Sequence, residues 1–97
     1  MNVGVCKVTL RLPENHSLKG KRQVIKSITS RVAGKFNVSV DEVSDQNLWQ
    51  ITAIGFSCVS NDGRHANEML SKVVDFIAQS HCEAELLDYE IEIIPVF

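Results

Sequence analysis

Basic residues are concentrated just after Ser17, at a place where a helix is expected to begin. Serine is a favoured N-cap residue, and Lys19, Lys21 and Arg22 follow within the first turn or just beyond it. Cations near a helix N-terminus are disfavoured, by roughly 0.3–1 kcal/mol each at an exposed site, but together with free backbone N–H groups they would attract an anion. We therefore predict a site for RNA phosphates formed by Ser17, Lys19, Lys21, Arg22 and Lys26. The alternative is a basic helix face that only contacts water.

Charge is distributed asymmetrically along the chain. The 97 residues carry a net charge of −2. Residues 1–36 hold eight basic side chains and one acid, a balance of +7, whereas residues 37–97 hold two basic side chains and eleven acids, a balance of −9. Lys7 and Arg11 are expected to pair with acids of the last strand, because cross-strand pairs of opposite charge contribute about 0.2–1 kcal/mol each. The remaining positive charge is expected on the first helix.

Other reactive residue types lack the spacing that catalysis or metal binding needs. Gly20 and Lys21 do not form a P-loop, because that motif needs a glycine five residues earlier and a serine or threonine after the lysine. The three histidines and three cysteines show no metal-ligand spacing. We therefore expect no metal, no cofactor and no enzymatic activity. Cys6 and Cys58 are predicted to be small apolar side chains of the core.

Hydrophobic periodicity predicts the elements that position these residues. Alternation of period two indicates four strands, at residues 2–12, 38–43, 48–59 and 84–96. Apolar residues at three- and four-residue spacing indicate two helices, at residues 17–36 and 63–80. The chain is expected to form a single domain, residues 1–97. With right-handed crossovers, the order βαββαβ gives a ferredoxin-like α+β fold: a four-stranded antiparallel sheet in the order 4-1-3-2, with two helices on one face.

The uncovered face of this sheet is a candidate partner surface. By alternation, Trp49 and Ile51 are expected there, near Val3 and Val5. An apolar cluster on an uncovered face is typical of a protein interface, so we predict a homo-oligomer formed through the open sheet face. The alternative is that a loop or the C-terminal segment 95–97 folds over the cluster.

The composition and the first residues of the chain also bear on where the protein is located. No apolar run approaches the roughly 20 residues of a membrane helix. No signal peptide precedes Lys7, and an odd number of cysteines in a domain with a sizeable core does not suggest a disulfide framework. We therefore expect a cytoplasmic protein with no membrane partner.

Four segments carry a resemblance to a known family. They are Ser17-Leu18-Lys19-x-Lys21-Arg22-x-Val24-Ile25-Lys26-Ser27, Phe36-Asn37-Val38-Ser39-Val40 followed by Glu42-Val43, Leu48-Trp49-Gln50, and Val59-Ser60-Asn61-Asp62. Through them nearly the whole chain resembles the YlxP-like family of small bacterial proteins of unknown function. The resemblance implies a ferredoxin-like fold and a gene neighbourhood shared with translation initiation and ribosome-maturation factors. It implies no catalytic residues.

Three functions remain open from the sequence. The first is a non-enzymatic RNA- or ribosome-associated factor that binds phosphate groups through the start of its first helix. The second is a small oligomeric regulatory or structural module that uses its open sheet face. The third is an acylphosphatase-like enzyme, against which the loop at residues 13–17 holds no arginine where such enzymes place one.

Overall fold

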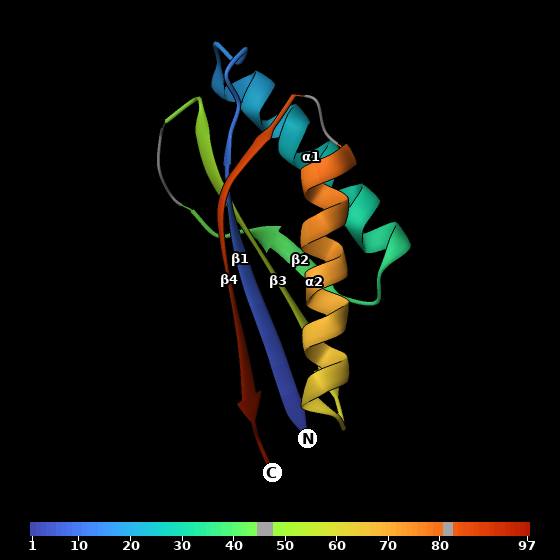
Figure 1. Ribbon diagram of the computed structural model, residues 1–97. Helices are drawn as coiled ribbons and strands as arrows, with labels where there is room; N and C mark the ends of the chain where they lie inside the picture. The colour runs from blue at the N-terminus through green and yellow to red at the C-terminus, as the bar shows by residue number, and fades with distance from the viewer. Residues whose placement is uncertain (45–47, 81–82) are drawn as a thin grey trace.

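Four strands form one antiparallel sheet, and two helices cover one of its faces (Figure 1). The computed structural model describes residues 1–44, 48–80 and 83–97. Its elements, in chain order, are β1 (Asn2–Arg11), α1 (Leu18–Lys35), β2 (Ser39–Glu42), β3 (Ile51–Ser60), α2 (Gly63–Ser80) and β4 (Glu85–Pro95). The sheet order β2-β3-β1-β4 is the predicted order read from the other edge. The expected ferredoxin-like α+β fold is therefore confirmed.

β1 lies in the middle of the sheet and pairs with β3 on one side and β4 on the other. Cys6, Val8 and Leu10 face the helices and are buried, while Lys7 and Arg11 face away and are exposed. This is the period-two pattern that the sequence predicts. The central strand therefore separates a covered apolar face from an open, partly charged one.

Both helices begin at residues whose side chains cap them. Ser17 Oγ accepts a hydrogen bond from the Gly20 N–H at 3.0 Å, and Asp62 Oδ1 accepts one from the Arg64 N–H at 2.9 Å. These bonds satisfy first-turn N–H groups that have no partner within the helix. Neither helix, and thus no helix of the described residues, combines the length and the hydrophobicity that a membrane crossing needs.

The core lies between the helices and the covered face of the sheet. Its largest fully buried apolar side chains come from both helices, the two central strands and the residue after β1: Val8, Leu10, Leu12, Ile28, Val32, Ile54, Leu70, Val73 and Ile77. α2 packs closely on Gly4 of β1, where a Cβ would lie 2.8 Å from Leu70 Cδ1. Glycine at this position lets the helix pack directly on the strand.

β3 begins at Ile51, three residues later than the strand predicted at residues 48–59. Its partner β1 ends at Arg11, which lies opposite Ile51, and Pro13 beyond it has no N–H to donate to a ladder. The residues before Ile51 therefore have no neighbouring strand along which to continue. The prediction that Trp49 lies within the sheet is wrong for this reason.

A β-bulge in β4 changes which leucine faces the core. Thr9 pairs with Asp88, but the next residue of β1, Leu10, pairs with Leu86, so Leu87 is the extra residue. Leu86 packs against the core, whereas Leu87 is 47% exposed. The period-two alternation predicted for residues 84–96 therefore fails at this point, because it does not continue across a bulge.

The two adjacent leucines provide a matched test of the bulge. We expect Leu86→Ala to lower the free energy of unfolding by about 2 kcal/mol, the lower end of the range for buried leucines, because Leu86 is only partly buried. Leu87→Ala should lower it by less than about 0.5 kcal/mol. Urea denaturation of both variants measures the difference, and equal losses would contradict the register.

Candidate functional site

Five of the six cations of α1 are exposed. Lys19, Arg22 and Lys26 have three- and four-residue spacing, which places them within about 60° of arc on one side of the helix. α1 contains no acidic residue, and in the described part of the chain none of these three cations forms an ion pair. We call Lys19, Arg22 and Lys26 the basic stripe.

Lys21 is the exception and corrects the predicted phosphate site. Its side chain is buried, with 4% of the residue exposed, in line with Ile25, Ile28 and Val32 on the core side of α1. Its ammonium Nζ lies 3.4 Å from Glu42 Oε2 on β2. The prediction that Lys21 is available to a ligand at the surface is wrong, because the core-facing stripe extends one turn further towards the helix start. The four-residue spacing from Lys21 to Ile25 is the sequence signal for this.

Polar groups from several segments bond to the Glu42 carboxylate. Thr52 Oγ1 of β3, itself buried, donates to Glu42 Oε2 at 2.8 Å, and Ser44 Oγ donates to the same oxygen at 3.5 Å. Ser44 Oγ also accepts from the Ala53 N–H at 3.2 Å. With Lys21 included, the carboxylate joins α1, β2 and β3 on the covered side of the sheet. The polar groups around Glu42 therefore bond to one another within the fold, where a buried polar group needs a partner.

Side chains of the preceding loop make hydrogen bonds around the start of α1. Asn15 Nδ2 donates to the Ser17 carbonyl at 2.8 Å and also to the Trp49 carbonyl. A Cβ at Gly20 would overlap with Asn15 Oδ1, so the glycine makes room for this amide. Ser17 is thus engaged as a capping residue. Ser17 remains exposed, and the charged groups of the predicted phosphate site that remain at the surface are the side chains of the basic stripe.

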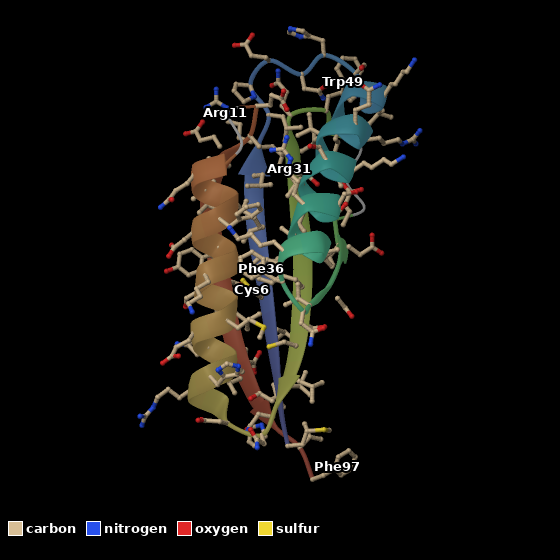
Figure 2. All side chains as sticks on the ribbon, turned by 90° about the vertical axis from the view of Figure 1, so that its right-hand side faces the viewer. Cys6, Arg11, Arg31, Phe36, Trp49 and Phe97 are labelled. Carbon is tan, nitrogen blue, oxygen red and sulfur yellow. The ribbon has the colours of Figure 1, made fainter. Side chains whose placement is uncertain are left out.

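Trp49 lies beside the start of α1 and not on the open sheet face (Figure 2). It is 51% exposed. The neighbouring Gln50 also makes hydrogen bonds to the segment before α1. The Gln50 carbonyl accepts from the Leu12 N–H at 2.7 Å, and the Gln50 side-chain amide donates to the Asn15 carbonyl at 3.4 Å. The position of Trp49 is therefore determined by hydrogen bonds between two loops, which strand alternation does not reveal.

The structure does not bring together the residues predicted as an interface: Val3, Val5, Trp49 and Ile51. Ile51 pairs with Arg11, whereas Val3 pairs with Val59. Val3 and Arg11 lie near opposite ends of β1, about 26 Å apart at the usual rise of a strand. The prediction of one cluster is wrong because antiparallel pairing places the start of β3 beside the end of β1.

The open face of the sheet carries an apolar row and a hollow. Val3 lies between Val59 of β3, which is 67% exposed, and Ile94 of β4, which is 40% exposed. Towards the middle of the sheet, a hollow of about 720 Å³ is lined by residues of all four strands, Val5 and Lys7 among them. This face is therefore mixed in character, apolar at one end and charged towards the middle.

Two ion pairs cross from β1 to β4 on the open face. Lys7 Nζ lies 3.9 Å from Glu90 Oε2, and Arg11 Nη1 lies 3.9 Å from Glu85 Oε2. All four side chains are exposed, so each pair contributes at most about 1 kcal/mol. The prediction that Lys7 and Arg11 pair with acids of the last strand is confirmed.

The described thiols are core residues. Cys6 and Cys58 are free and buried, as predicted. Burial raises the pKa of the Cys6 thiol to about 12, so near neutral pH it stays protonated and is a poor nucleophile. Cys82 and His81 lie outside the described residues. Among the residues that are described, no group of three His, Cys, Asp or Glu side chains could hold a metal ion.

Comparison with known proteins places these features in a family context. A family model described as "Protein of unknown function (DUF503)" matches residues 3–91. The chain is also 44% identical over 61 residues to the uncharacterized protein YlxP of Bacillus subtilis (strain 168). That alignment covers 63% of this chain and 66% of the relative, which is slightly less than two thirds of its length.

Substitution of Glu42 tests whether the buried pair fastens α1 to the sheet. We expect Glu42→Ala to lower the free energy of unfolding by about 2–4 kcal/mol, because the buried Lys21 ammonium loses its carboxylate. Lys21→Met should cost less, since the Glu42 side chain is 31% exposed and water can solvate its charge.

Asp41 provides the control for this measurement. It is exposed on the same strand, next to Glu42, and Asp41→Ala should cost less than about 1 kcal/mol. Urea denaturation of the three variants gives the comparison. If Glu42→Ala were no more destabilising than Asp41→Ala, the buried pair would not hold the helix.

Proposed function

The chain belongs to the DUF503 family of proteins of unknown function, and we propose that it is a non-enzymatic factor that binds RNA phosphates through the basic stripe of α1. The observation that carries the proposal is the set of exposed cations Lys19, Arg22 and Lys26 on a helix without acids. The gene neighbourhood implied by the resemblance to YlxP-like proteins supports a ribosomal particle in the cytoplasm as the partner.

The basic stripe has the chemistry of a phosphate-backbone contact. Lys19 and Lys26 are seven residues apart, about 10 Å along the helix axis, so their side chains reach a short stretch of nucleic-acid backbone. Cations in the first turns oppose the helix dipole, and the stripe contributes nothing to the core. A polyanion would remove both the mutual repulsion of the cations and their conflict with the dipole.

The proposal is non-enzymatic because the loop before α1 is used structurally. In an acylphosphatase-like protein this loop would bind the phosphate, with an arginine. Here it contains none, Ser17 caps the helix, and the Asn15 amide bonds two backbone carbonyls. These roles leave the loop committed to holding the start of α1.

Charge reversal in the basic stripe tests the proposal. We expect Lys19→Glu with Arg22→Glu to weaken binding of a single-stranded RNA oligonucleotide, and of small ribosomal subunits, at least about tenfold at low salt. The slope of log K against log salt concentration should become shallower by about 0.7 for each phosphate that the variant no longer neutralises. Fluorescence anisotropy and sedimentation at several salt concentrations measure both. Lys21 is left unchanged because its substitution would report on folding.

A matched control separates the stripe from net charge alone. Arg64 and Lys72 are exposed cations of α2, and Arg64→Glu with Lys72→Glu produces the same change in net charge. This variant should bind nearly as the wild type does. Equal weakening by both double variants would contradict a defined site on α1, and a wild type without salt-sensitive RNA binding would remove the proposal altogether.

The apolar row on the open face favours a second candidate function, a module that self-associates through its sheet. The exposed Val59 and Ile94 flank the partly exposed Val3 there and form a contiguous strip with it. In this case analytical ultracentrifugation should show a dimer that Val59→Glu dissociates, while Trp49→Ala leaves it intact because Trp49 lies at the start of α1. A monomeric wild type at high concentration would exclude this candidate.

A further inference from the structure

We propose that Trp49 is a stacking platform for an unpaired base, so that the RNA taken by this protein is single-stranded next to the basic stripe. The inference rests on the proposed function and specifies which form of RNA that site accepts. It arises from the position of Trp49, which the sequence places in the sheet and the structure places at the start of α1.

Trp49 combines exposure with a fixed backbone. Half of its surface is accessible (51%), although tryptophan has a large apolar surface to bury. Its carbonyl is held by the Asn15 amide, and Gln50 makes two further bonds to the segment around Leu12 and Asn15. An aromatic ring on an anchored backbone stacks on a base at a smaller entropic cost than a ring on a free loop.

The ring lies where the basic stripe begins. The same Asn15 amide nitrogen donates to the Trp49 carbonyl and to the carbonyl of Ser17, the residue that caps α1. Lys19 and Arg22 follow within the first two turns, and Figure 2 shows Trp49 beside these turns. Proteins that bind single-stranded nucleic acids combine exposed cations along the phosphate backbone with aromatic side chains on which the bases stack.

The chemistry of the site favours an unpaired base over a duplex. In a duplex each base lies stacked between its neighbours, so an aromatic side chain has no base face to contact. The inference does not use the backbone N–H groups of the helix, and that of Gly20 already donates to Ser17 Oγ. The recognition elements are the Trp49 ring and the ammonium and guanidinium groups of the stripe.

Tryptophan fluorescence tests the inference directly, because the chain contains one tryptophan. We expect a short oligouridylate to quench the emission of the wild-type protein, and the same strand annealed to oligoadenylate to quench it far less. Trp49→Ala should weaken binding of the single strand by about 5- to 150-fold, the range for removing one base–aromatic stack, and Trp49→Phe should retain most of the affinity. Tyr89→Ala, which removes another exposed aromatic ring on β4, should bind as the wild type does.

The outcomes separate the stacking inference from the proposed function. If Lys19→Glu with Arg22→Glu abolishes RNA binding while Trp49→Ala binds normally and the emission does not change, the RNA-binding function stands and stacking is refuted. If oligouridylate and its duplex bind and quench equally, the preference for single strands is refuted. An emission that shifts with protein concentration in the absence of RNA, together with a dimer on sizing, would assign Trp49 to a protein interface. If no RNA binds, both proposals fail.

Discussion

The ion pair between the buried Lys21 and the partly buried Glu42 is the polar constraint on the placement of α1. Ile25, Ile28 and Val32 give the helix its apolar contacts with the core, and Lys21 extends this row by one turn towards the helix start. An ammonium group removed from water needs a charged or polar partner, and the Glu42 carboxylate at 3.4 Å supplies one. With Lys21 turned inward, the geometry of the helix turns Lys19 and Arg22 outward.

The cations of the first 36 residues lie in different surroundings in the fold. Lys7 and Arg11 neutralise acids of β4 on the open face. Lys21 is part of the core and holds α1 to β2. What remains is Arg31, Lys35, whose ammonium lies 4.9 Å from the centroid of the Phe76 ring, and the basic stripe, whose cations form no ion pair within the described part of the chain. The compositional asymmetry of the sequence is therefore real, but only this remainder is informative about a partner.

Local signals in the sequence were sufficient for the fold, whereas the site depended on contacts between distant segments. Alternation along β1 and the capping residues Ser17 and Asp62 are properties of neighbouring residues, and the topology follows from their order. Alternation does not predict the position of Trp49, because β3 begins at Ile51 and the period of two does not extend past the end of the strand. The partner of Lys21 was missed because spacing along α1 shows that a residue faces inward but not which residue of β2 it meets.

The contact between Gly20 and Asn15 makes two positions of the chain evolutionarily interdependent. No side chain larger than hydrogen fits at Gly20 while the Asn15 amide occupies that space. A mutation that added a methyl group there would displace the amide that holds the Trp49 carbonyl. Divergence in the family should therefore change the two positions in concert: a relative with a larger residue in place of Gly20 should have a smaller residue in place of Asn15 or hold that side chain in another position, and it should fasten its tryptophan loop in another way.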